Sequence, residues 1–310
     1  MKVIYIGADE GFESVSELMP SAIELSHIEA TQEAMEERIG DADAIIDASM
    51  RVKFDDSMLI KATRLKIISC ATTGSDHIAR GELDARNIPV RTLKEDRELL
   101  RNITPAAELS WALLMACARK LPAACNHVRN GGWTRELFPG VMLRGKTLGL
   151  VGCGRIGGWM TRYATGFGMN IIGFDPYLEK YPDNCQISTL EEVFQTSDFI
   201  SIHVHLNDET RGMITRDLFR QIKKGAIFIN TSRSAVTDES GLLEVLESGQ
   251  MGAAGLDVLD GEPDIADNPL LKYAQSHDNL LITPHCGGYS PDAVKMVCRR
   301  AAEKVLEALG

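Results

Sequence analysis

Short apolar runs alternate with longer, mixed stretches along the whole chain. The runs that we predict to be strands are Val3–Ile6, Ala44–Ile46, Leu65–Ser69, Pro89–Arg91, Leu148–Val151, Ile171–Phe174, Phe199–Val204, Ala226–Ile229, Ala253–Leu256 and Leu280–Ile282. Most of these runs are almost continuously apolar, which is typical of parallel strands that are covered on both faces. The pattern therefore predicts an α/β fold with parallel sheets between layers of helices.

A polar stretch near residues 93–104 divides this pattern into two parts. It ends at Thr104 and Pro105, a capping residue followed by proline, which is a start signal for a helix. We expect one lobe of residues 1–95 plus 286–310, because the last helix (Asp292–Leu309) packs back on it, and a second lobe of residues 96–285. Both are expected to be doubly wound and Rossmann-like, the first of them flavodoxin-like, with a ligand-binding cleft between them.

Composition and charge narrow the function classes. The chain has 310 residues, of which 44% are hydrophobic, and this is enough to bury a large core. Its net charge of −11 disfavours nucleic acid and anionic membranes as partners. The N-terminal MKVIYIGADEG lacks the long apolar stretch of a signal peptide, and we expect a cytoplasmic protein.

The seven cysteines are widely scattered and form no C-x-x-C pair. They are Cys70, Cys117, Cys125, Cys153, Cys185, Cys286 and Cys298. This spacing favours reduced, buried thiols over a disulfide framework, and no metal site is expected. Cys153 and Cys286 lie inside motifs described below, so inhibition by their oxidation is the alternative to simple packing.

The strongest motif is a strand that runs into a glycine-rich turn and then a helix. Leu148–Val151 is followed by Gly152-x-Gly154-x-x-Gly157. Gly152 allows a tight turn, Gly154 lets a pyrophosphate approach the backbone, and Gly157 permits close packing of helix on strand. The N–H groups at the helix start then face the phosphates. This arrangement predicts a dinucleotide site.

The next predicted strand, Ile171–Phe174, ends at Asp175. A carboxylate at this distance from the glycine turn accepts hydrogen bonds from the ribose hydroxyls of NAD and repels the 2′-phosphate of NADP. The following Pro176 and Tyr177 supply no cation that would compensate this repulsion. We therefore expect NAD as the cofactor.

Five longer stretches of the chain form a recognisable set. They are GKTLGLVGCGRIG (145–157), FDPY (174–177), GAIFINTSRSAVTDE (225–239), GLDVLDGEP (255–263) and ITPHCGG (282–288). Together they resemble the D-isomer-specific 2-hydroxyacid dehydrogenases, and D-3-phosphoglycerate dehydrogenases are closest in pattern. The resemblance covers nearly the whole chain. It implies hydride transfer between NAD(H) and a small anionic 2-hydroxy or 2-keto acid, and usually a homodimer joined through the cofactor lobes.

The resemblance assigns the catalytic roles to Arg233, Glu262 and His285. Reducing a keto acid requires a group that anchors its carboxylate and a proton donor to the developing alkoxide. The guanidinium fork of Arg233 suits the first task, and the imidazole of His285 suits the second. Glu262 is expected beside His285. Each of the three taken alone also fits an ordinary role, as an ion-pair, loop or capping residue, and their common order along the chain favours the catalytic set.

Further residues follow from the same resemblance. The cofactor contacts are expected to include Gly152, Gly154, Arg155, Ile156, Gly157, Asp175, Thr231 and Asp257. For Asp257 the alternative is a cap at the end of a strand. The substrate contacts are expected to be Arg233 and the loop after the strand Leu65–Ser69, which contains Ala71, Thr72, Thr73 and Gly74. Backbone N–H groups in such a loop can bind an anion.

Three alternatives remain open. His203 and His205 share one face of a predicted strand and could begin a metal site, although no third ligand follows in sequence. The basic Arg51, Lys53, Arg80 and Arg135 either bind a substrate phosphate or lie solvated on the surface. A protein that senses NAD and acts as a corepressor is the rival to an enzyme, and turnover of 2-keto acids separates the two.

Overall fold

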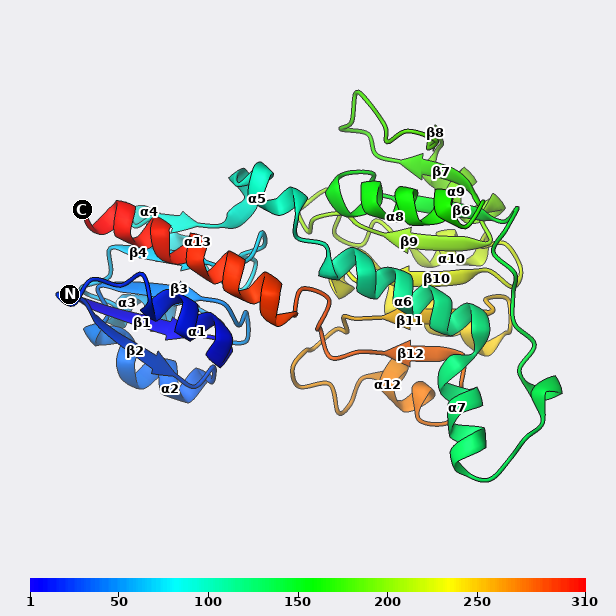
Figure 1. Cartoon of the computed structure of the whole chain (residues 1–310), viewed down its shortest axis with the longest axis horizontal. Helices are drawn as coiled ribbons and strands as arrows, with labels where there is room; N and C mark the ends of the chain where they lie inside the picture. The colour runs from blue at the N-terminus through cyan, green and yellow to red at the C-terminus, as the bar shows by residue number, and fades with distance from the viewer. The chain divides into compact units, whose positions relative to one another are not determined.

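The computed structural model describes all 310 residues and divides them into two compact units, each built on its own sheet (Figure 1). Unit 1 contains Met1–Ile103 and Gly288–Gly310, and unit 2 contains Thr104–Gly287. The sequence pattern placed these divisions at 95/96 and 285/286. They lie at 103/104 and 287/288 because Leu100 and Ile103 are buried in one cluster with Leu93 and Ala293 of unit 1.

Unit 1 is built on a sheet of five parallel strands in the order β2-β1-β3-β4-β5. The strands are β1 (Lys2–Ile6), β2 (Glu24–Ile28), β3 (Ala44–Asp47), β4 (Ile67–Cys70) and β5 (Val90–Arg91). Four of them were predicted from their apolar runs. The edge strand β2 was missed because its sequence, ELSHI, has only two apolar residues among five and none of its side chains is fully buried.

Helices cover both faces of the sheet in unit 1 (Figure 1). One face is covered by α1 (Asp9–Ser16) and α13 (Pro291–Leu309), which bury Val15, Cys298 and Val305 against β1, β3 and β4. The other face is covered by α2 (Gln32–Arg38), α3 (Asp56–Lys61) and α4 (Gly81–Ala85). The short α5 (Arg97–Arg101) follows β5. The C-terminal helix thus packs on the first unit, as the sequence predicted.

Unit 2 is built on a sheet of seven parallel strands in the order β12-β11-β10-β9-β6-β7-β8. The strands are β6 (Thr147–Val151), β7 (Asn170–Phe174), β8 (Gln186–Ile187), β9 (Phe199–Ile202), β10 (Ile227–Asn230), β11 (Ala253–Leu256) and β12 (Leu280–Ile282). Only β8 was not predicted, because it has two exposed residues and no apolar run.

The sheet of unit 2 is also covered on both faces. One layer contains α6 (Pro105–Arg119), which continues into α7 (Leu121–Arg129), and α8 (Arg155–Gly166). The other layer contains α9 (Leu190–Thr196), α10 (Arg216–Arg220), α11 (Glu239–Glu247) and α12 (Pro269–Ala274). Leu113, Leu114 and Met160 are buried in the first layer, and Phe194, Phe219 and Leu246 are buried in the second. No helix of the structure has the length and apolar character needed to cross a membrane.

The strand order of unit 2 creates a point beside β6 at which the chain stops adding strands on one side and starts adding them on the other. From the central β6 it continues to β7 and β8 on one side, and it then returns to β9, the other neighbour of β6. Parallel sheets of this kind bind ligands beyond the carboxyl ends of their strands, at this point of reversal. Both units therefore have the Rossmann-like α/β architecture that was predicted, and unit 2 has the strand order of a dinucleotide site.

Candidate active site

The glycine-rich turn follows β6 and leads into α8. Gly152 has φ +91°, and a Cβ atom there would lie 2.5 Å from the carbonyl oxygen of His203. A Cβ on Gly157 would lie 2.3 Å from the carbonyl oxygen of Gly152. Both contacts involve backbone atoms, which cannot move aside cheaply. The fold of the chain itself therefore requires glycine at 152 and 157.

Gly154 differs from these two glycines because no contact within the protein requires glycine at this position. A Cβ atom at this position would meet no protein atom within 4 Å. It is the N-cap residue of α8 and makes no side-chain cap. Open space beside the positive end of a helix dipole fits a pyrophosphate. The residues present thus fit a dinucleotide such as NAD.

Asp175 lies at the carboxyl end of β7, directly beside the glycine turn. Its Oδ2 accepts a hydrogen bond from the backbone N–H of Cys153 at 2.9 Å, and its Oδ1 accepts one from the N–H of Tyr177 at 3.1 Å. The side chain of Asp175 is half-buried. These bonds fix the carboxylate next to the turn, where the sequence prediction expected it.

Arg233 lies in the turn after β10, and Asn230 shapes that turn. The side-chain amide of Asn230 donates to the carbonyl oxygen of Arg233 at 3.0 Å. Its Oδ1 accepts from both the N–H and the hydroxyl of Ser232, at 2.9 Å and 2.8 Å. Asn230 is almost fully buried, so its side chain serves the turn and not the solvent. The sequence prediction did not assign this role to Asn230.

His285 and Glu262 are in direct contact, although they come from two different loops of unit 2. Nδ1 of His285 lies 3.0 Å from each carboxylate oxygen of Glu262. About a third of each side chain is exposed. The contact with Glu262 occupies Nδ1, so Nε2 is the ring nitrogen that is left for another partner. His285 has φ +52°, a left-handed conformation that is rare for a residue with a side chain.

The loop that carries Glu262 is braced from α11. Glu239, the first residue of α11, accepts a hydrogen bond from the N–H of Asp260 at 2.7 Å and one from the side-chain amide of Asn268 at 2.9 Å. Burial raises the pKa of Glu239, and the negative charges of Asp260 and Glu262 add to this, against the effect of the two hydrogen bonds. The sequence prediction missed this brace, because no motif connects Glu239 to Glu262.

Asp257 follows β11 and is almost fully buried. Its Oδ1 accepts hydrogen bonds from the hydroxyl of Thr283 at 2.5 Å and from the N–H of Cys286 at 2.9 Å. Its Oδ2 accepts one from the N–H of Gly287 at 2.7 Å. These donors flank His285 on both sides. The bonds match the alternative role, in which Asp257 braces the ends of neighbouring strands, and they hold the segment that carries His285.

The loop expected to bind a carboxylate lies in unit 1, after β4. The N–H of Ala71 donates to the carbonyl oxygen of Asp47 at 2.8 Å, so it is occupied within the protein. The N–H groups of Thr72, Thr73 and Gly74 have no acceptor in the protein. The hydroxyl of Thr72 donates to the carbonyl oxygen of Gly74 at 2.8 Å and tightens the turn. Three successive free N–H groups in a tight turn fit an anion.

A buried pair of side chains anchors the same loop. Nε2 of His77 lies 2.5 Å from Oδ2 of Asp47, whose Oδ1 accepts hydrogen bonds from the N–H groups of Ser49 and Met50. Together with Cys70, these two residues form a group in which each offers one possible metal-ligand atom. The three atoms, from Asp47, Cys70 and His77, lie within 4.8 Å of one another. Burial and the charge of Asp47 raise the pKa of the Cys70 thiol, which keeps it protonated. We interpret this cluster as a brace between β3 and the loop.

The structure also gives the surroundings of the remaining predicted residues. The hydroxyl of Thr231 lies 2.7 Å from that of Ser110 on α6. The ring of His203 is hydrogen-bonded to Ser201 at 2.8 Å, and burial lowers the pKa of this histidine to about 3. The structure brings no third metal-ligating side chain to His203 and His205. Arg135 pairs with the neighbouring Glu136 on the surface, whereas Arg80 donates to Ser75 beside the loop of unit 1.

A protein-family model matches most of unit 2. Residues 111–287 match the family model described as D-isomer specific 2-hydroxyacid dehydrogenase, NAD binding domain. This segment lies within unit 2 and contains the glycine turn, Asp175, Arg233, Glu262 and His285.

Relatives of known name also extend over unit 1. A D-3-phosphoglycerate dehydrogenase of Methanocaldococcus jannaschii is 37% identical over 288 residues, which cover 90% of this chain and 52% of the relative. A hydroxypyruvate reductase of Thermotoga maritima is 37% identical over 75% of this chain and 77% of the relative. The chain thus spans about half the length of the phosphoglycerate dehydrogenases that it matches.

A solved structure supports the same grouping. The TT0316 protein from Thermus thermophilus is 31% identical and superposes with a TM-score of 0.84, and the match covers 100% of this chain and 97% of that one. The similarity in fold therefore extends over both units.

Proposed function

This chain belongs to the D-isomer specific 2-hydroxyacid dehydrogenase family, and from this premise we propose that it interconverts a small 2-keto acid and the corresponding D-2-hydroxy acid with NAD(H). The observation that carries the proposal is the contact between His285 and Glu262, on loops that follow adjacent parallel strands of an NAD-binding unit. A histidine held by a carboxylate is a proton donor and acceptor of the kind that the reaction requires.

We assign the roles of the chain's own residues as follows. Arg233 binds the carboxylate and the carbonyl oxygen of the substrate through its two aligned N–H groups. Nε2 of His285 donates a proton to the carbonyl oxygen in reduction and accepts one from the hydroxyl in oxidation. Glu262 orients His285 through Nδ1. The nicotinamide supplies or accepts the hydride when the cofactor is bound.

The loop of unit 1 is our candidate for a second contact with the substrate carboxylate. The free N–H groups of Thr72, Thr73 and Gly74 support this role, and the occupied N–H of Ala71 makes that residue a structural one. Asp47 and His77 hold the loop in shape through their hydrogen bond.

The experiment that tests the activity is steady-state oxidation of NADH with a panel of 2-keto acids. We expect turnover with at least one of glyoxylate, hydroxypyruvate, phosphohydroxypyruvate, pyruvate and 2-ketoglutarate, and its loss in Arg233→Lys, because a lysine lacks the planar fork. Binding of NADH without turnover of any keto acid would contradict the proposal and support the corepressor instead.

A more specific proposal is that the substrate carries a phosphate group. Arg51, Lys53 and Arg80 are basic residues of unit 1, and Arg80 is hydrogen-bonded beside the loop at Ser75. If they bind a phosphate, Arg80→Gln will raise KM for phosphohydroxypyruvate and leave KM for hydroxypyruvate unchanged. Lys66→Gln, an exposed lysine elsewhere in unit 1, is the matched control. An equal effect on both substrates would remove phosphate recognition from the proposal.

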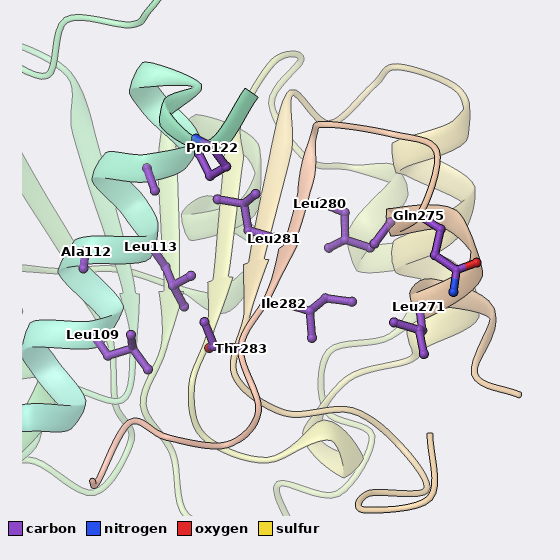
Figure 2. A pocket seen from close by; sticks show the side chains of 12 residues that line it. Leu109, Ala112, Leu113, Pro122, Leu271, Gln275, Leu280, Leu281, Ile282 and Thr283 are labelled. Atoms are coloured by element: carbon purple, nitrogen blue, oxygen red, sulfur yellow. The ribbon is translucent and has the colours of Figure 1, made fainter. Parts of the chain in front are cut away.

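We also propose that the chain forms a homodimer through unit 2. Trp133, Leu137 and Met142 lie on the segment between α7 and β6, and they are 88%, 58% and 74% exposed. The same unit has an apolar pocket of about 550 Å³ between α6, α12 and the edge strand β12. In Figure 2 Leu281 points towards α6, whereas Leu280 and Ile282 point towards α12.

The exposed side chains and the pocket are both apolar. A symmetric dimer would bury both of these features in each of its two chains. A second copy also covers the free edge of β12, which otherwise exposes unpaired backbone groups. Light scattering should give the mass of a dimer for the wild type and of a monomer for Trp133→Gln combined with Met142→Gln. Ile60→Gln, which removes an exposed apolar side chain of unit 1, should remain dimeric.

A further inference from the structure

Cys153 and Cys185 are far apart in sequence, but their thiols lie against each other in unit 2. A Cβ atom on Gly173 of β7 would lie 2.4 Å from Sγ of Cys153 and 2.8 Å from Sγ of Cys185. Both sulfur atoms therefore border the same small space beside Gly173. Gly173 thus leaves the space that the two sulfur atoms share. All seven cysteines of the chain are free, so this pair is a reduced dithiol.

The pair joins two segments that border the proposed dinucleotide site. Cys153 is the second residue of the glycine turn and is 2% exposed, and its N–H donates to Asp175 at 2.9 Å. Cys185 lies on the irregular segment between β7 and β8 and is partly exposed. The hydroxyl of Tyr181 fixes this segment, because it accepts from the N–H of Asp175 at 2.8 Å and donates to the carbonyl oxygen of Asp175 at 2.9 Å.

We propose that Cys153 and Cys185 are a site of reversible oxidation to a disulfide, and that this modification weakens the binding of NAD(H). The oxidant is a small-molecule disulfide of the glutathione disulfide class. The inference rests on the proposed function only in that it takes the glycine turn as the dinucleotide site. It does not depend on which keto acid is the substrate.

The chemistry is two successive thiol–disulfide exchanges. The Cys185 thiol loses a proton, and its sulfur attacks one sulfur of the small disulfide and releases one small thiolate. The Cys153 thiol then loses a proton, and its sulfur attacks the Cys185 sulfur of this mixed disulfide and releases the second thiolate. The two cysteines lose two electrons in total, the small disulfide gains them, and the two released protons convert the thiolates to thiols.

The surroundings of the two thiols set this order. The neighbouring thiol of Cys185 raises the pKa of Cys153, and burial raises it further. The thiol of Cys153 lowers the pKa of Cys185, against an opposing effect of burial. Because the thiolate is the attacking species and the oxidant must reach it, the more exposed Cys185 reacts first. Cys153 is then already in contact with the sulfur that it attacks.

A disulfide has to change the glycine turn. Its S–S bond length of about 2.0 Å is shorter than any contact between two thiols, so the two sulfur atoms must approach each other. We expect this to displace the backbone of Cys153, which donates a hydrogen bond to Asp175 and continues directly into Gly154. Coupling between two sites typically changes an affinity by about 5- to 150-fold. We therefore expect the dissociation constant of NADH to rise by about fivefold or more.

None of the other five cysteines has a second thiol beside it. Burial raises the pKa of Cys70, Cys117 and Cys298, and it also raises the pKa of the partly exposed Cys286, whose Sγ donates to Asp257 at 3.7 Å. Cys125 is exposed on α7. Cys125 therefore reacts with the same oxidant but has no thiol beside it. Cys125→Ser is the matched variant, because it removes an accessible thiol without touching the pair.

The test uses the full chain, oxidised with glutathione disulfide and then alkylated. Peptide mass mapping should recover Cys153 linked to Cys185, and dithiothreitol should reverse the link. NADH fluorescence titrations should show weaker binding after oxidation in the wild type and in Cys125→Ser. Cys185→Ser should bind NADH like the reduced wild type before and after treatment. Cys185→Ala replaces it if the serine variant does not fold.

Two outcomes would overturn the inference. The first is a peptide map in which Cys153 and Cys185 remain unlinked while Cys125 is modified, and the second is a linked protein with unchanged affinity for NADH. A reduced protein that fails to bind NADH would instead contradict the proposed function, because the peptide map still reports separately on the disulfide.

Discussion

Nδ1 of His285 lies 3.0 Å from both carboxylate oxygens of Glu262, although the two residues belong to loops that follow different strands. The backbone of each loop is held by a separate carboxylate, of which that of Asp257 is buried and that of Glu239 is partly buried. Asp257 holds the segment around His285, and Glu239 holds the N–H of Asp260 near Glu262. The proposed proton-transfer pair is thus fixed in position by a second layer of hydrogen bonds, and this arrangement leads to the first two predictions.

Replacing His285 by asparagine should lower kcat in both directions by roughly 10²–10⁴-fold, the range that a positioned acid–base group contributes. Asparagine is chosen because the backbone at this position has φ +52°, which asparagine tolerates better than alanine does. The dissociation constant of NADH should change little. His277→Asn, which removes a histidine stacked on Tyr273, is the control and should retain full activity. A kcat within a few-fold of the wild type would remove His285 from the mechanism.

Replacing Glu262 by glutamine should lower kcat by about 10²-fold or more and leave KM for the keto acid nearly unchanged. The amide keeps the shape of the carboxylate but loses the charge that orients the imidazole through Nδ1. The matched control is Asp264→Asn, which removes an exposed carboxylate from the same loop. If both variants lost activity equally, the effect would come from the charge of the loop and not from the contact with His285.

Replacing Asp175 by asparagine should reduce the preference for NADH over NADPH. The wild type is expected to prefer NADH, because the carboxylate beside the glycine turn repels a 2′-phosphate. Asparagine retains an oxygen that accepts from Cys153, so the turn keeps its shape while the charge is lost. Asp183→Asn changes an exposed carboxylate in the following segment and should leave the preference unaltered. The measurement is kcat/KM for both cofactors, and equal values in the wild type would contradict this prediction.

Replacing Asp96 by asparagine should destabilise unit 1 at neutral pH. The carboxylate accepts a hydrogen bond from Arg300 at 2.7 Å and another from the buried Lys304, both on α13. Burial alone would raise the pKa of Asp96, but the hydrogen bonds from Lys304 and Arg300 outweigh it and lower the pKa. Breaking such a pair leaves Lys304 without its main counter-charge and should cost about 2–4 kcal/mol.

The sign of this pKa shift sets the pH dependence. A carboxylate with a lowered pKa stabilises the fold above its unfolded pKa of about 4 and loses this effect as the pH falls through the folded value. Hydrogen exchange in α13 should therefore differ between wild type and Asp96→Asn at pH 7, and the difference should shrink below about pH 4. Glu17→Gln, which removes an exposed partner of Arg299, should change exchange little at either pH. A difference independent of pH would show that the charge of Asp96 is not its cause.

Much of the fold could be predicted because it depends on local pattern. The buried parallel strands are continuous apolar runs, and the glycine turn is a contiguous motif whose φ values and close contacts require glycine at 152 and 157. The edge strands β2 and β8 carry no such signal, because their stability comes from pairing with β1 and β7 and not from burial of their own side chains.

The sequence by itself determined which residues stand at the carboxyl ends of the strands, since in a parallel sheet each of these ends is fixed by where its apolar run stops. On that basis Asp175 could be named in advance, whereas Arg233 and His285 were named because the stretches around them resemble the dehydrogenase family. Tertiary structure alone decided which side chains from distant segments meet there: Asp257 with the backbone around His285, Asp47 with His77, and Cys153 with Cys185. Such contacts depend on how helices and loops pack across the sheet. Packing is set by the whole chain, so no spacing within one motif specifies them.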